Sequence, residues 1–260
     1  MTEATLPPLE PPRRLHFDWL LPALFRPRSA FAKIAAYEHG AWLTPLLLLT
    51  ILALVRVAVT GPIQIAQLQS TPLTPPPGFE TLPPQQQEQF YQSQAQAQGM
   101  LTSPVLIYIL PAAGALLGTW IGWLATFGLL HLLLTLLGGR GSTRNAMNVV
   151  AWASLPYALR DILRIGYLLA TQRLIAAPGL SGFAPTGGLG PVIAALFQNV
   201  DIYLFWYIAL IVLGVTVADK MSRIKALSGV LVTMLVLGLL TAAPAALGAL
   251  FLGATSGGTF

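Results

Sequence analysis

Long apolar runs, separated by polar, Pro-rich or Gly-rich stretches, make up most of the chain from residue 42 onward. A transmembrane α-helix needs about 20 mostly apolar residues, because each residue adds about 1.5 Å and the hydrocarbon core is about 30 Å thick. The pattern therefore predicts an all-α fold, a polytopic membrane helix bundle with about five transmembrane helices. The predicted spans are residues 42–60, 112–137, 147–170, 201–218 and 226–252.

The second apolar run is longer than one straight span requires. It extends from Pro104 to Leu137, which as a single α-helix would be about 51 Å long. Pro111 lacks the amide hydrogen that an interior helical residue donates, so it either marks the start of the span or kinks it. The pattern leaves both alternatives open.

The region before the first span has two parts. The polar, Pro-rich residues 1–15 predict a disordered tail. Residues 16–41 mix aromatic and basic side chains and predict a cytoplasmic amphipathic segment. Phe31, Ile34 and Ala35 share one face of a short helix there, and we expect this helix to lie along the membrane surface.

Two polar loops interrupt the predicted transmembrane domain, which covers residues 42–253. Residues 61–103 are rich in Pro and Gln and contain no Lys or Arg, and residues 171–200 are rich in Gly and Pro with Arg173 as their one basic residue. Loops that lack positive charge are typical of the outer side of a membrane. We therefore expect both loops to be external.

Composition agrees with a membrane protein. Hydrophobic residues make up 55% of the chain and charged residues only 9%, whereas soluble domains carry about a quarter charged residues. The net charge of +5 comes without a basic run or a basic–aromatic stripe, so no nucleic-acid partner is expected. Cysteine is absent, which excludes disulfides, a thiol nucleophile and a Cys-based metal site.

The basic residues also predict an orientation. With the N-terminus inside, ten of the 14 Lys and Arg residues fall on the inner side, three fall within spans and only Arg173 is outside. Positive residues accumulate on the cytoplasmic side of membrane proteins, so we expect an inner N-terminus. The ten inner residues are Arg13, Arg14, Arg26, Arg28, Lys33, Arg140, Arg144, Lys220, Arg223 and Lys225.

Three segments resemble the Yip1 domain family of multi-pass membrane proteins. They are LFRPRSAFAKIAAYEHGAWLTP before the first span, GGRGSTRNAMNVVAWASLPYALRDI through the third and DIYLFWYIALIVLGVTVADKMSRIKAL across the fourth. The resemblance implies a five-helix membrane protein that acts through protein contacts, and bacterial relatives include accessory partners of ABC-type exporters. The acidic Asp-Leu-Tyr-Gly-Pro motif that eukaryotic members carry before the first span has no match here, which argues against a Rab-GTPase or vesicle-coat role.

Ionisable residues inside predicted spans are the first functional candidates, because each costs a few kcal/mol unless it is paired or hydrated. Five of them lie at similar depths in their predicted spans and can meet in one intramembrane polar cluster. Asp161 is able to pair with Arg164 one helical turn away. The cluster is either a substrate or ion pathway or an internal clamp between helices, and the clamp is the favoured interpretation. Its members are Arg56, Arg160, Asp161, Arg164 and Asp201.

Gly114, Gly118 and Gly122 form a second candidate, because glycines four residues apart let another backbone approach one helix face closely. That face serves either internal packing or association with a partner. An inner charged turn sets topology, with docking or anionic-lipid binding as alternatives; it comprises Asp219, Lys220, Arg223 and Lys225. His131 has no nearby ligand partners in the sequence, so it favours a hydrogen bond between helices over a metal site.

No catalytic constellation is present in the sequence, so an enzyme, a cofactor and a metal centre are not expected. The favoured function is a non-enzymatic scaffold or accessory and assembly factor for a membrane partner, with an ABC-type export system as a possible partner class. The alternative is a small transporter or channel subunit that uses the buried Arg and Asp residues. The expected partners are the lipid bilayer and a membrane protein or a second copy of the chain, and the expected location is a bacterial cytoplasmic membrane.

Overall fold

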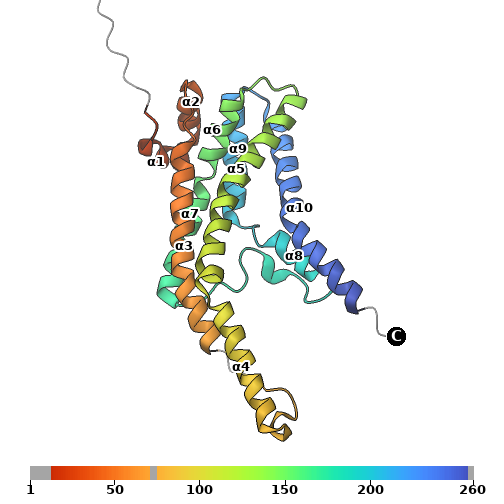
Figure 1. Ribbon diagram of the computed structural model, residues 1–260. Helices are drawn as coiled ribbons and strands as arrows, with labels where there is room; N and C mark the ends of the chain where they lie inside the picture. The colour runs from red at the N-terminus through yellow and green to blue at the C-terminus, as the bar shows by residue number, and fades with distance from the viewer. Residues whose placement is uncertain (1–12, 71–74, 257–260) are drawn as a thin grey trace, which may run out of the picture. The chain divides into compact units, whose positions relative to one another are not determined.

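The computed structural model describes residues 13–70 and 75–256, with side chains described up to residue 248, and every regular element in these ranges is helical (Figure 1). Most of the predicted disordered tail, residues 1–15, therefore lies outside the described residues. The α-helices are α1 (Leu20–Phe25), α2 (Pro27–Ala36), α3 (Leu43–Ser70), α4 (Pro84–Leu101), α5 (Leu110–Leu136), α6 (Thr143–Ala153), α7 (Leu155–Thr171), α8 (Gly190–Phe197), α9 (Ile202–Ala218) and α10 (Arg223–Ser256).

Several of these helices can cross a membrane. By length and apolar composition, the described residues contain 3 such helices, or up to 4 if α8 and α9, bent by 55°, form one broken span. The three are α3, the continuous helical stretch Pro84–Leu136 and the first part of α10 to Gly248. Their most apolar windows are only 28%, 6% and 17% buried inside the protein, so most of these side chains need lipid around them. The prediction of an all-α membrane protein is confirmed, whereas the count of five and the orientation stay predictions.

Pro111 neither ends the second span nor interrupts its helix. A π-helical turn, Val105–Ile109, directly precedes α5 and joins it to α4. Proline lacks a backbone N–H, and its ring presses on the carbonyl group four residues earlier, at Ile107. A π-helical turn widens the helix at that point, which lets the proline fit without a break.

The third predicted span, residues 147–170, is divided into two helices. α6 ends at Ala153 and α7 begins at Leu155, so the break falls two residues before Pro156. The backbone N–H and the hydroxyl of Ser154 both donate to the carbonyl oxygen of Ala151, at 3.3 and 2.6 Å, which closes the last turn of α6. Each half is shorter than the roughly 20 residues that span a bilayer.

Helices also extend into the predicted loop 61–103. α3 continues to Ser70 with Pro62 inside it, and the Gln-rich stretch forms α4, which buries none of its residues. A long helix without a buried face is typical of a segment that water surrounds. This polar helix therefore fits a loop outside the bilayer.

The chain groups into two compact units. Among the described residues, unit 1 comprises residues up to Leu47, Trp123–Leu155 and Trp206–Leu235, and unit 2 comprises Leu48–Gly122, Pro156–Phe205 and the chain from Val236 onward.

The amphipathic helix predicted in residues 16–41 is α2, and its apolar face packs inside unit 1. Phe31 is 0% and Ile34 1% exposed, and α2 contacts α6. Gly214 of α9 makes room for this packing, because a Cβ atom there would lie 2.6 Å from Val149 and 3.2 Å from the Phe31 ring. A neighbouring helix without a side chain at Gly214 therefore accepts this face, and the position of the helix along the membrane surface stays a prediction.

Two side chains of α6 hold the residue that leads into α3. The amide side chain of Asn148 accepts a hydrogen bond from the backbone N–H of Ala41 at 2.9 Å, and the indole N–H of Trp152 donates to the carbonyl oxygen of Ala41 at 2.9 Å. Asn148 is 1% and Trp152 0% exposed. Because both backbone groups of a buried residue are satisfied, the segment before α3 has a fixed path.

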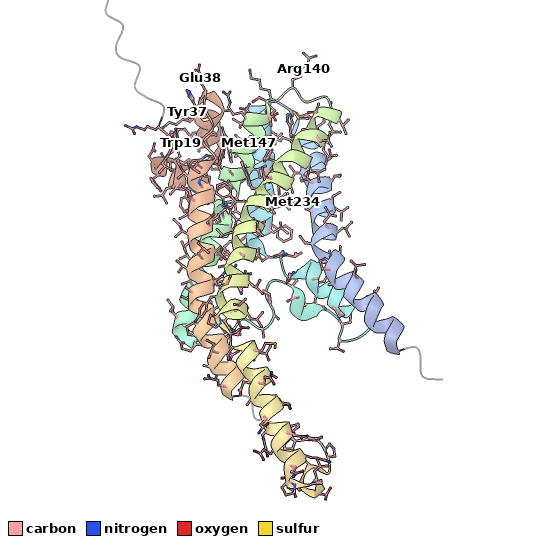
Figure 2. The ribbon with its side chains drawn as sticks, in the orientation of Figure 1. Trp19, Tyr37, Glu38, Arg140, Met147 and Met234 are labelled. Atoms are coloured by element: carbon pink, nitrogen blue, oxygen red, sulfur yellow. The ribbon has the colours of Figure 1, made fainter. Side chains whose placement is uncertain are left out.

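His16 is also part of this core. It is 4% exposed, stacks on Trp19 with ring centroids 4.0 Å apart and meets the edge of Tyr37 at 4.8 Å. Figure 2 shows Trp19 and Tyr37 close together at the N-terminal end of unit 1. Burial lowers the pKa of His16 below its ordinary value of 6.5, and this effect outweighs the nearby carboxylate of Asp18, which raises the pKa.

This shift predicts that acid weakens the packing of the N-terminal segment. Below the ordinary pKa of about 6.5, unfolded His16 binds a proton that the folded site disfavours, so stability falls as pH drops through that value. We expect hydrogen-exchange protection in residues 13–41, corrected for the intrinsic pH dependence of amide exchange, to be weaker at about pH 5.5 than at about pH 7.5. The variant His16→Phe keeps an aromatic ring against Trp19 and should lose this pH dependence. An equal acid effect in the variant would contradict the assignment.

Candidate functional site

The five residues of the predicted intramembrane polar cluster all take part in ion pairs within unit 2. Arg56 lies on α3 and Asp161 on α7, and the Arg56 Nε atom is 3.5 Å from the Asp161 Oδ1 atom. Among the described residues, neither atom has a hydrogen-bond partner. The Asp161 side chain is 9% exposed and that of Arg56 38%, so the pair links two helices with its carboxylate buried and its cation partly open.

Asp201 forms the second half of the cluster. Its Oδ2 atom lies 3.3 Å from Arg160 and 3.8 Å from Arg164. Its Oδ1 atom accepts a hydrogen bond from the backbone N–H of Leu204 at 3.0 Å, which caps the first turn of α9. One carboxylate therefore neutralises two guanidinium groups and completes a helix end.

The pairing differs from the sequence prediction in one respect. The helix spacing allows Asp161 to pair with Arg164 along α7, but within 4.0 Å it pairs with Arg56, and Arg164 pairs with Asp201. Arg160 and Arg164 are four residues apart and share a helix face, so both reach the carboxylate before α9. Asp161 points elsewhere around α7 and meets the neighbouring helix.

The cluster carries more positive than negative charge. Arg160 also lies over the ring of Tyr157, with its guanidinium carbon 4.5 Å from the ring centroid, and this cation–π contact adds to its stabilisation. Three arginines face two carboxylates, which leaves one net positive charge. Such an arrangement can hold helices together or attract an anion, and it lacks the chain of titratable acids that a proton relay needs.

The glycine face of α5 is open. A Cβ atom placed at Gly114, Gly118 or Gly122 would meet no described atom within 4 Å beyond its own helix surroundings. At these three glycines, the described residues therefore leave space that a side chain could fill. This differs from Gly214, where a Cβ atom would overlap its neighbours.

The inner charged turn has structural contacts that the sequence did not indicate. Lys225 donates to the carbonyl oxygen of Leu137 at 2.9 Å, which satisfies a backbone group at the end of α5. The carboxylate of Asp219 lies so close to Gly141 that a Cβ atom on Gly141 would overlap it. Burial raises the pKa of Asp219, and a hydrogen bond from Asn145 offsets part of that rise. Lys220 and Arg223 are exposed.

His131 contacts a hydroxyl group rather than a group of metal ligands. Its Nε2 atom is 3.2 Å from the hydroxyl oxygen of Thr143. Within the described residues, no three His, Cys, Asp or Glu side chains gather closely enough to hold a metal ion. The hydrogen-bonding role expected for His131 fits this contact.

The pairing of Arg56 with Asp161 predicts the effect of removing the carboxylate. Asp161→Ala leaves a partly buried cation without its partner, and we expect a loss of about 1–3 kcal/mol in stability, because Arg56 retains some access to its surroundings. Asp161→Asn should lose less, since the amide oxygen still accepts a hydrogen bond. Thermal unfolding in detergent measures both, with Glu88→Ala on the exposed α4 as control. Wild-type stability in Asp161→Ala would contradict a structural ion pair.

Comparison with known proteins identifies the family. The family model for the Yip1 domain matches residues 23–247, nearly the whole chain. The comparisons with curated proteins and with solved structures gave no match. The matched range includes the entire ion-pair cluster, the glycine face and the inner charged turn. By this match and by its apolar helices, the chain belongs to the Yip1 domain family of membrane proteins.

Proposed function

We propose that this Yip1 domain protein is a non-enzymatic scaffold or accessory factor that associates with a partner inside the membrane. The observation that carries the proposal is the glycine face of α5, where a Cβ atom on Gly114 or Gly118 would meet none of the described residues within 4 Å. Close approach of a second helix is the usual use of glycines at this spacing in a bilayer. The partner class we favour is a membrane component of an ABC-type export system in a bacterial cytoplasmic membrane.

The ion-pair cluster supports the same function as a clamp. Its two carboxylates, Asp161 and Asp201, tie α3, α7 and the start of α9 together within unit 2. A rigid arrangement of these helices suits a protein that presents a fixed surface to a partner. The cluster's residual positive charge is the observation that favours the second candidate, a small transporter or channel subunit for an anion.

If the protein is a scaffold, leucine should disturb partner association at one glycine and folding stability at another. Gly118→Leu adds a side chain to an open helix face, so the protein should fold normally and lose co-purification with its partner. Gly214→Leu forces a side chain against Val149 and Phe31 and should cost about 1–3 kcal/mol in stability. Gly238→Leu on α10, where a Cβ atom also meets nothing within 4 Å, is the matched control and should alter neither property.

Chemical crosslinking in native membranes and thermal unfolding of the same samples measure both outcomes. Association that survives Gly118→Leu unchanged would rule out this face as the contact surface. Solute transport by the purified chain alone in liposomes would contradict the scaffold function and favour the transporter.

A further inference from the structure

An open groove lies in unit 1 where α2 begins beside α9. It has a volume of about 470 Å³ and is lined by Arg26, Pro27, Arg28, Ser29 and Leu213. The scaffold function does not use this groove. Its lining combines two cationic side chains with apolar surface from a helix that can cross the membrane together with α8.

The polar side of the groove is positively charged, and no counter-ion lies beside it among the described residues. Arg26 and Arg28 are exposed, and no described carboxylate lies within 4.0 Å of either. Both stand at the start of α2, with Pro27 as the first helical residue. The amide groups of a first helical turn have no acceptor within the helix, and the helix dipole is positive there. An anion in the groove would therefore meet two guanidinium groups and a helix N-terminus together.

The apolar side points to the kind of anion. Leu213 belongs to α9 and closes the groove on the side of the apolar helix. The helix that precedes the groove, α1, leaves Leu21 68% and Phe25 70% exposed. Large apolar side chains beside exposed arginines are typical of protein surfaces that sit at the boundary of headgroups and acyl chains. A small inorganic anion would match only the arginines, whereas a phospholipid matches both sides.

We propose that this groove binds an anionic phospholipid. Its phosphate lies against Arg26, Arg28 and the start of α2, one acyl chain follows Leu213 along α9, and α1 inserts Leu21 and Phe25 beside it. The cytoplasmic leaflet carries the anionic lipids that such a site needs. This placement anchors the N-terminal helices of unit 1 to one lipid class, independently of any protein partner.

The test uses the purified full-length chain in nanodiscs of phosphatidylcholine with and without phosphatidylglycerol. Native mass spectrometry then measures which lipid stays bound. We expect the wild type to retain phosphatidylglycerol in preference to phosphatidylcholine. The double variant Arg26→Gln, Arg28→Gln should weaken that preference by a factor on the order of 30, from the usual contribution of a basic side chain at an anionic membrane surface.

The matched control is Arg14→Gln, Arg140→Gln, which removes the same charge from exposed positions of unit 1 outside the groove and the inner charged turn (Arg140 is labelled in Figure 2). It should keep the wild-type lipid preference. Equal losses in both double variants would show a general charge effect and overturn the proposal. Displacement of phosphatidylglycerol by inorganic phosphate would assign the groove to a free anion and also overturn it. If the double variant folds poorly, Arg28→Gln alone should give a smaller loss in the same direction.

Discussion

Arginines that are shielded from water need carboxylates beside them, because a buried charge without a partner is strongly destabilising. Here the carboxylates are Asp161, against Arg56, and Asp201, against Arg160 and Arg164. Asp201 also caps α9, so charge neutralisation and helix geometry depend on one side chain. The ion pairs therefore fix how α3, α7 and the start of α9 meet within unit 2.

Unit 1 is organised by packing rather than by charge. The apolar face of α2, with Phe31 at its centre, packs where Gly214 leaves space, and Asn148 and Trp152 fix the chain at Ala41. The N-terminal helices are therefore part of the folded protein. With this face buried, the arginines at the start of α2 and the large apolar residues of α1 are left at the surface, which is the arrangement that lipid binding at the groove requires.

The sequence predicted the helical membrane fold and the members of the ion-pair cluster. Long apolar runs, and the few charged residues within or beside them, can both be recognised along the chain. It did not predict which arginine pairs with Asp161, since helix periodicity describes neighbours on one helix and not side chains on another. The break at Ser154 was missed because proline inside a span is common, and only the backbone shows whether it bends or divides the helix. The role of Gly214 was hidden, because an isolated glycine gives no spacing signal.

A double-mutant cycle on Arg160 and Asp201 tests the dependence of the fold on these ion pairs most directly. Asp201→Asn retains a side chain that caps a helix well, so the cycle with Arg160→Gln isolates the charge interaction from the cap. We predict that the two losses in unfolding free energy, measured in detergent, are coupled by about 1–3 kcal/mol. Losses that add to within about 0.5 kcal/mol would contradict it.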